Sequence, residues 1–479
     1  MPGRFLSLFK PVATLMPEVK VPKKRIGFRE KLLWTALVAV FYLIMTEIPL
    51  FGATRGPNDP FYALRVIFAS SRGSLMELGI QPIVTSGLIM QLLATSKIIG
   101  FDNTNSGDRA LLSGVTKFVS ILMTTFLAIG YIISGSYGTG LSLYTQIAIF
   151  IQLFVAGLVV ILLDELMQKG WGFGSGISLF IAAGVAEKII WDLLSPLPFE
   201  EDGKVLGSLI SYFQAILGLT TTGVKESPLN AFIYRTNADA PTMLGLMATI
   251  IIFSLVIFLN QLKIDIPISY AKYKGFGGRY PIKFLYISNI PVILVSSLFM
   301  DFYFISQIIW SRFNIDNNNP WLNLIGTYDS NNQPTGGLVM YLTAPRNFQQ
   351  FLGSPIRAFV YAAMLIGLCA IFAIIWIEVS GMDPRTVAQQ LVDSGMQISG
   401  FRRSVGPIQS VLQRYIPTVS ILGAITVGAV ASFSDFFGVY GTGTGILLTV
   451  GILQQMYQSM AQDQMLEMFP LMGRLLGKT

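Results

Sequence analysis

Residue types that commonly carry out catalysis are scarce in this sequence. The chain of 479 residues has no histidine and a single cysteine, Cys369, which lies within an apolar run. Without histidine, Ser-His-Asp and Cys-His catalysis, HExxH zinc sites and histidine proton relays are excluded. Acidic residues in the apolar segments lie mostly near segment ends, and Asp301 is the main exception. The sequence therefore predicts no enzymatic activity, no metal site and no cofactor, and it disfavours an ion-coupled transporter.

Helix-breaking residues mark a second group of positions. Pro82 lies in GIQPIV and Pro291 in SNIPVIL, and glycine-rich runs open GFGSGIS at 172–178 and GTGTGIL at 441–447. Branched aliphatic side chains flank or follow each break. They are Ile80, Val84, Ile177, Ile181, Ile293 and Leu448.

Such aliphatic side chains could line a narrow passage. A ring of them excludes water by dewetting and makes no directional polar contacts, so it suits cargo of varied chemistry. A selective small-solute site would instead need a few placed polar groups. Ordinary core packing is the alternative interpretation. The GTGTG run lacks the Lys-Ser/Thr of a phosphate loop and does not predict a nucleotide site.

The composition is that of a membrane protein. Hydrophobic residues make up 52% of the chain and charged residues 12%, whereas a soluble domain carries about 25% charged residues. So much apolar surface requires lipid as the solvent, and ten segments approach the roughly 20 apolar residues of a spanning helix. They are 32–51, 76–95, 111–134, 143–163, 174–192, 242–261, 284–304, 356–377, 416–437 and 441–460.

The distribution of Lys and Arg predicts the orientation. If the N-terminus is cytosolic, about two thirds of the 33 Lys and Arg residues fall in cytosolic segments. Residues 1–31 lack a continuous apolar core and are expected to form an amphipathic, basic cytosolic segment rather than a signal peptide. We therefore expect both termini in the cytosol. The net charge of +7 fits either this bias or contact with nucleic acid or anionic lipid.

The chain divides into two halves. The polar stretch 193–241 separates five spans from five spans, so the halves must have opposite orientations, as in inverted repeats. Proline in the second span and glycines in the fifth span of each half support this symmetry. The predicted organisation is an N-terminal half 32–192, a lumenal hinge loop 193–241, a C-terminal half 242–460 with cytosolic loops 262–283 and 378–415, and a cytosolic tail 461–479.

Six segments carry a family resemblance. They are KLLWTALVAVFYLIMTEIPLFG, LRVIFASSRGSLMELGIQPIVTSGLIMQLL, IQLFVAGLVVILLDELMQKGWGFGSGISLFIA, YPIKFLYISNIPVIL, WIEVSG and GTGTGILL. These segments resemble the alpha subunit of the eukaryotic Sec translocon, a SecY-type protein-conducting channel, and the resemblance runs from about residue 5 to about residue 460. It implies an all-α polytopic membrane fold, with ten transmembrane helices in two inverted pseudo-symmetric halves and a plug helix.

The resemblance also implies a function. Unfolded nascent polypeptides would cross the endoplasmic reticulum membrane through the pore, and signal sequences and transmembrane segments would leave laterally into the lipid bilayer. The six aliphatic residues after the helix breaks match the pore ring of the family. The stretch 53–72 matches the plug. Arg65, Arg72 and Glu378 match charged positions associated with the plug and with topology, although a charge snorkelling to the interface is the alternative.

The lateral gate of the family lies where spans two and three meet spans seven and eight. Thr85 matches a threonine of its polar cluster. Phe126 and Asp301 stand where relatives carry glutamine and asparagine. We expect Asp301 to pair with a cation or to titrate, and so to alter the threshold for gate opening.

Basic residues in the two cytosolic loops could contact ribosomal RNA phosphates. They are Lys272, Lys274, Arg279, Arg402 and Arg403. The bias of positive charge to the cytosolic side is the alternative explanation. Other partners implied by the resemblance are two small single-span translocon subunits, beta and gamma, and membrane partners that recruit lumenal chaperones. A secondary transporter with inverted repeats and a membrane-embedded enzyme are the competing function classes.

Overall fold

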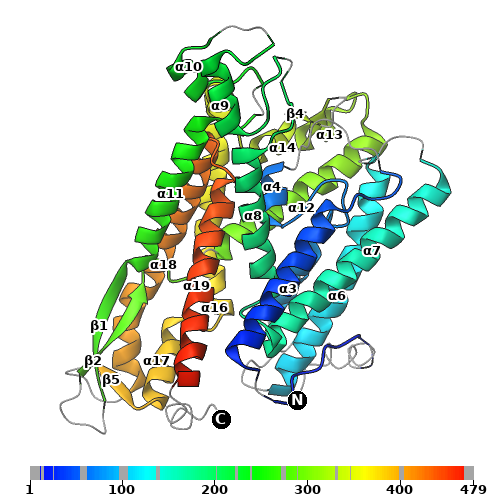
Figure 1. The fold of residues 1–479 in the computed structure, drawn as a ribbon. Coiled ribbons are helices and arrows are strands. Elements are labelled where there is room, and N and C mark those ends of the chain that lie inside the picture. The colour runs from blue at the N-terminus through cyan, green and yellow to red at the C-terminus, as the bar shows by residue number, and fades with distance from the viewer. Residues whose placement is uncertain are drawn as a thin grey trace.

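The computed structural model describes residues 11, 16–24, 26–53, 62–95, 106–135, 137, 141–200, 202–221, 225–237, 240–270, 277–287, 290–329, 333–345, 347–398 and 404–468. Long helices run side by side, and the start of α3 and the end of α19 lie at the same end of the bundle (Figure 1). Most of the predicted leader, residues 54–61 of the predicted plug, and the tail from residue 469 lie outside the described residues.

Ten of the helices correspond to the ten predicted spans. They are α3 (Phe28–Glu47), α5 (Gln81–Thr95), α6 (Ser106–Ile133), α7 (Leu143–Leu166), α8 (Gly176–Leu194), α11 (Met243–Gln261), α12 (Ile290–Phe313), α16 (Pro355–Val379), α18 (Val405–Phe436) and α19 (Gly443–Met468). Within the described part of the chain, α6, α7, α11, α12, α16 and α18 are each long and apolar enough to cross a membrane. Of the other four, α5 packs against α6, α8 against α7, α19 against α18, and α3 against α8.

Two prolines begin helices rather than interrupt them. Pro82 and Pro291 are the second residues of α5 and α12. Proline is tolerated there because the first amide groups of a helix have no intrahelical acceptor. The expectation that Pro82 breaks a span over 76–95 is therefore wrong. The chain before α5 forms turns, and the amide of Ile80 donates to the carbonyl of Phe68 at 2.8 Å.

The two predicted cytosolic loops are joined by a small sheet. Strand β1 (Lys263–Tyr270) pairs antiparallel with β2 (Gly277–Lys283) and with β5 (Met396–Ile398), in the order β2-β1-β5. The second loop also holds α17 (Pro384–Asp393). It is shorter than predicted because α18 already begins at Val405 and continues through Pro417. Backbone pairing between β1 and β5 makes the two loops one structural unit.

The predicted hinge loop is folded. It contains α9 (Ser208–Leu217) and α10 (Pro228–Ile233). Arg235 is buried against Glu200, with Nε 2.9 Å from Oε1, and its guanidinium also donates to the carbonyls of Val205 and Leu206. Burial lowers the pKa of Arg235, while the nearby carboxylate of Glu200 opposes this shift. The ion pair and the backbone hydrogen bonds of Arg235 thus hold the loop between the two halves in a defined conformation.

Short elements cover the C-terminal half at the opposite end from the sheet (Figure 1). They are α13 (Pro320–Ile325), β3 (Thr327–Tyr328), β4 (Pro334–Gly336), α14 (Gly337–Leu342) and α15 (Phe348–Gly353). Tyr328 anchors them to α12, because its hydroxyl lies 3.0 Å from Oγ of Ser306 and its ring packs against Trp310.

Two apolar clusters form the interior. One is built mainly from α3 to α8 and extends to α12 and α19, and the other is built from the helices of the C-terminal half. Phe302 on α12 packs against both clusters. An ion pair between the start of α3 and the end of α19, with Lys31 Nζ 2.5 Å from Asp463 Oδ2, also joins these two helices. The first and last spanning helices are therefore in contact.

Candidate pore and lateral gate

The six aliphatic residues next to the helix breaks gather in one apolar cluster. Three are fully buried members, and three pack against the cluster with partly exposed side chains. The buried ones are Ile80, Ile181 and Leu448, and the partly exposed ones are Val84, Ile177 and Ile293. They come from α8, α12, α19 and the start of α5, so both halves contribute. The structure brings the predicted ring residues together, and their role in a pore stays a prediction.

Matching positions in the two halves supply these residues. Val84 and Ile293 each stand two residues after the proline in the first turn of their helix. Ile181 and Leu448 each stand five residues after the first glycine of their helix. Two unrelated kinds of helix start thus place aliphatic side chains at equivalent depths in the inverted halves. This agreement favours a shared passage over chance packing.

A short helix in the predicted plug lies against the same helices. Helix α4 (Tyr62–Ile67) contacts α8, α12 and α19. Val66, Ile67 and Phe68 are members of the apolar cluster that holds the ring residues. A side chain added at Gly445 would come within 3.4 Å of Val66. The described part of the plug is therefore packed where the ring residues converge.

Arg65 anchors this segment through a buried ion pair. Its Nη2 lies 2.6 Å from Oε1 of Glu77, and both side chains are almost wholly buried. Arg65 Nη1 also donates to the carbonyl of Glu77, and the guanidinium lies 5.9 Å from the centre of the Tyr131 ring. The other carboxylate oxygen of Glu77 accepts from the amide of Gly73. The predicted site did not include Glu77, although its acidic side chain within an apolar stretch was the available signal.

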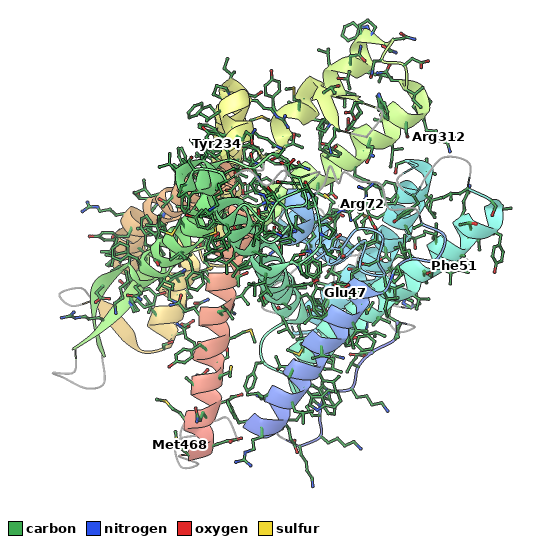
Figure 2. The ribbon with its side chains drawn as sticks, turned by 45° about the horizontal axis from the view of Figure 1, so that its top comes forward. Glu47, Phe51, Arg72, Tyr234, Arg312 and Met468 are labelled. Carbon is green, nitrogen blue, oxygen red and sulfur yellow. The ribbon has the colours of Figure 1, made fainter. Side chains whose placement is uncertain are left out.

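The structure also describes the other two predicted charged residues, Arg72 and Glu378. Arg72 is half-buried on the loop after α4 (Figure 2). Glu378 is exposed in the last turn of α16. The assignment of these two residues to plug or topology functions stays a prediction.

Polar contacts join α5 to α12, as expected for a gate between the halves. Asp301 accepts a hydrogen bond from Gln81 Nε2 at 3.0 Å and one from the Thr85 hydroxyl at 3.3 Å. The hydroxyls of Thr85 and Ser297 are 3.2 Å apart. Among the described residues, the hydrogen-bond partners of Asp301 are therefore neutral donors. These contacts do not show the expected pairing with a cation. Gln81 and Ser297 were not predicted, because only the packing of the two halves brings them to Asp301.

Aromatic contacts join α6 to α12 beside this polar cluster. Phe126 is half-exposed, and its ring packs edge-on against Phe304 at a centroid distance of 6.5 Å. The ring of Tyr131 lies 4.9 Å from that of Phe304. A Cβ at Gly130 would overlap the Phe304 ring, so glycine permits this close approach. The contact of position 126 with α12 is therefore apolar.

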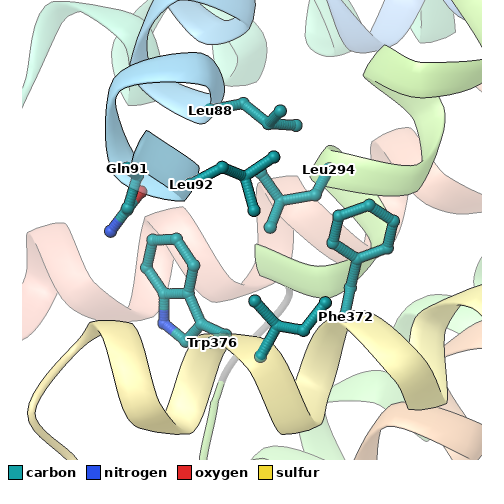
Figure 3. Close-up of a pocket in the computed structure, with 7 residues that line it drawn as sticks. Leu88, Gln91, Leu92, Leu294, Phe372 and Trp376 are labelled. Atoms are coloured by element: carbon teal, nitrogen blue, oxygen red, sulfur yellow. The ribbon is translucent and has the colours of Figure 1, made fainter. Parts of the chain in front are cut away.

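An apolar groove continues the α5–α12 seam. It lies between α5, α12 and α16 (Figure 3). The lining is aliphatic and aromatic apart from one amide. It consists of Leu88, Gln91, Leu92, Leu294, Phe372, Ile375 and Trp376. The groove begins one helical turn beyond Thr85, so the seam changes from polar to apolar along α5.

Comparisons with known proteins agree with this arrangement. Residues 74–457 match the SecY family model, and residues 40–73 match the model described as the plug domain of Sec61p. The chain belongs to the SecY family. One solved relative, described as a protein-conducting channel, is 35% identical and has a TM-score of 0.80, with 96% of this chain and 98% of that chain covered.

Other solved structures of the SecY family give a consistent comparison. Sec61 of the canine ribosome-channel complex from the endoplasmic reticulum is 34% identical, with a TM-score of 0.78 and coverage of 96% of this chain and 98% of that chain. The yeast Ssh1 complex bound to the 80S ribosome gives 25% identity and a TM-score of 0.74, with 94% and 93% covered. The predicted all-α polytopic channel fold is confirmed, and the SecY-family chain is a protein-conducting channel rather than an enzyme.

The predicted ribosome contacts of this SecY-family chain fall mainly outside the described residues. Outside the described residues lie Lys272, Lys274, Arg402 and Arg403. Arg279 is described: it lies on β2, is highly exposed, and stands 3.6 Å from Asp265. Such a surface pair contributes little to stability, so the guanidinium stays available to a phosphate. Its role in ribosome binding stays a prediction.

Proposed function

We propose that this SecY-family chain is the central pore-forming subunit of the protein translocation channel of the endoplasmic reticulum. Unfolded nascent polypeptides cross the membrane through it, and signal sequences and transmembrane segments leave it laterally into lipid. The single observation that carries the pore assignment is the apolar cluster in which Ile80, Ile181 and Leu448 meet the plug segment. Aliphatic side chains seal such a pore against water and make no directional demands on a passing chain.

The seam between α5 and α12 supports a lateral gate. It is closed by hydrogen bonds from Gln81 and Thr85 to Asp301 rather than by a continuous apolar core. The apolar groove next to it offers a surface for a hydrophobic segment that enters between the halves. The seam would open when an apolar segment and lipid replace the hydrogen bonds between α5 and α12.

The sheet on the two cytosolic loops supports ribosome binding. Pairing of β1 with β5 joins the two loops whose sequences contain the predicted basic residues. The canine and yeast relatives were both determined in complexes with ribosomes. By the same proposal, both termini are cytosolic and the chain assembles with two small single-span subunits and with partners that recruit lumenal chaperones.

The pore assignment is tested by crosslinking a stalled nascent chain. A photoreactive amino acid is placed at Ile181 in one variant and at the lipid-facing Ile251 in another, since Ile251 is largely exposed on α11. Ribosome–nascent chain complexes carrying an unfolded segment are then bound to each variant in microsomes. We expect crosslinks to the nascent chain from position 181 and none from position 251. Equal crosslinking from both positions, or from position 251 alone, would contradict a pore at the aliphatic cluster.

A secondary transporter, the competing class in the sequence analysis, predicts a different result. Purified protein in proteoliposomes would take up a small solute against a gradient, and ribosomes would not co-sediment with it. We expect co-sedimentation with ribosomes and no gradient-driven uptake. Only uptake coupled to an ion gradient would favour the transporter.

A further inference from the structure

Two buried carboxylates occupy matching places in the inverted halves. Asp164 lies near the end of α7, and Asp435 lies near the end of α18. Each is therefore on the fourth spanning helix of its half, and their exposed fractions are 6% and 7%. Ionisable side chains within spanning helices are costly and usually have a specific partner. None of the pore, plug or gate contacts described above involves either residue.

In the N-terminal half, Asp164 holds the first turn of α8. The amide of Ile177 donates to Asp164 Oδ1 at 3.1 Å, and Gln168 Nε2 donates to Oδ2 at 2.7 Å. The hydroxyl of Ser175 accepts from the amide of Ser178 at 3.3 Å. The opening turn of α8 is thus bonded both to its own cap and to the preceding helix.

In the C-terminal half, Asp435 holds the first turn of α19 in the same way. The amide of Gly443 donates to Asp435 Oδ1 at 2.8 Å, and the hydroxyl of Tyr361 donates to Oδ2 at 3.3 Å. The hydroxyl of Thr442 accepts from the amide of Gly445 at 3.1 Å. Both halves therefore combine a hydroxyl cap with a carboxylate from the fourth helix.

Glycine at the first position of each fifth helix permits this contact. A Cβ at Gly176 would lie 2.5 Å from Cα of Asp164. A Cβ at Gly443 would overlap Cβ of Ser434, the residue before Asp435. Each fifth helix therefore begins in direct backbone contact with the fourth helix at the carboxylate.

These contacts determine how far each fifth helix extends into the bundle. A carboxylate at a helix N-terminus binds free amide groups and favours the positive end of the helix dipole. The fifth residue after each glycine, Ile181 or Leu448, then lies about 7.5 Å along the helix axis from its start. α8 and α19 run in opposite directions and pack against each other (Figure 1). The two carboxylates therefore act from opposite ends on side chains that meet in one cluster.

We propose that Asp164 and Asp435 are positioning residues for the pore constriction. Each carboxylate fixes the start of a fifth helix and so sets the depth of Ile181 or Leu448. This proposal rests on the proposed function, because it assumes that the aliphatic cluster is the constriction. It adds to that function a pair of residues that touch neither the cargo nor the gate.

The test reads the depth of one ring residue by its chemical reactivity. Cys369 is buried and is replaced by serine, and Ile181→Cys is introduced as the reporter. The rate of reaction with a membrane-impermeant maleimide is measured for the full chain in proteoliposomes. We expect Asp164→Ala to change this rate about tenfold, as loss of a hydrogen bond to a charged group would. Asp164→Asn keeps an oxygen acceptor and should stay within about twofold of the reporter chain that retains Asp164.

Glu165→Ala is the matched control. Glu165 is the next residue on α7, but its carboxylate binds Lys117 at 2.6 Å and Lys169 at 3.1 Å instead of the start of α8. Its loss should leave the maleimide rate unchanged. If Asp164→Ala does not fold, as judged by ribosome co-sedimentation, Gly176→Ala is used instead. The added Cβ displaces the start of α8 from α7 while the Asp164 carboxylate is retained. This substitution should change the maleimide rate similarly.

The outcomes separate the two proposals. Unchanged maleimide rates in the alanine variants, or equal changes in Asp164→Ala and Asp164→Asn, would overturn the positioning role. The same comparison with Leu448→Cys as reporter and substitutions at Asp435 tests the second half. Ion leakage through Ile181→Gly and Leu448→Gly channels tests the constriction itself. Absence of leakage would overturn the pore assignment, while the maleimide rates would still report how the helices are placed.

Discussion

Loss of the Asp301 carboxylate should make the closed gate less stable. Its oxygens accept from Gln81 and Thr85 across the seam between α5 and α12. These hydrogen bonds exist only while the helices are together, so they contribute to the closed state and not to a state in which α5 and α12 are apart. Asp301→Asn keeps one oxygen acceptor and Asp301→Ala removes both, so the two substitutions form a graded series.

The size of the effect follows from the hydrogen bonds. A hydrogen bond to a charged group contributes about 1.5–3 kcal/mol, and one between neutral groups about 0.5–1.5 kcal/mol. Asparagine can still accept from Gln81, so we expect the closed state to lose about 1 kcal/mol and opening to rise about fivefold. Alanine removes both acceptors, but it also removes the cost of burying a carboxylate. We therefore expect a net loss of about 2 kcal/mol and an increase in opening of about 30-fold.

Single-channel recording in planar bilayers measures this equilibrium. The open probability of the idle channel is compared among wild type, Asp301→Asn and Asp301→Ala, with Ser297→Ala as a control. Ser297 contacts Thr85 through a neutral hydroxyl pair, whereas Gln81 donates to the carboxylate of Asp301. We expect Ser297→Ala to have the smallest effect. Identical gating in wild type and both Asp301 variants would refute the reasoning, and so would a lower open probability in Asp301→Ala.

Three further predictions concern the plug, the constriction and the ribosome surface. Glu77→Gln should lower the free energy of unfolding of the detergent-solubilised protein by about 3–5 kcal/mol, because the buried Arg65 loses its ion pair. Thermal unfolding measures this loss, and replacing both residues by leucine should cause a smaller loss of stability. Ile293→Gly should leave a wetter resting pore, seen as ion leakage from proteoliposomes, and a tight bilayer would count against it. Charge reversal at both Lys274 and Arg402 should weaken ribosome co-sedimentation and steepen its salt dependence, whereas binding that stays constant across a salt series would speak against phosphate contacts.

Local patterns in the sequence were enough to predict the helices and the clustering of the six aliphatic residues. Apolar runs long enough to cross lipid predict ten spans, and helices are found at all ten. The helix-breaking prolines and glycines predicted which aliphatic residues stand together, because these residues act on the backbone within a few positions of themselves. The same local reasoning was wrong about Pro82, since an apolar run does not reveal whether a proline starts a helix or interrupts it.

Contacts between distant parts of the chain needed the tertiary structure. Gln81 and Asp301 are separated by 220 residues, and neither segment contains a sequence pattern that indicates its contact with the other. The pairing of Arg65 with Glu77 depends on how the loop before α5 folds back over α4. The pairing of β1 with β5 likewise depends on the placement of two separate loops.

The sequence by itself determined the solvent of this protein, the number of its spanning helices and its lack of histidine, because hydropathy and residue type are properties of the chain. Only the tertiary structure decided which polar groups join α5 to α12 and which carboxylates contact the first turns of α8 and α19. Hydrogen bonds such as those of Asp164 and Asp435 act over about 3 Å, and only the packing of helices brings their donors within that distance.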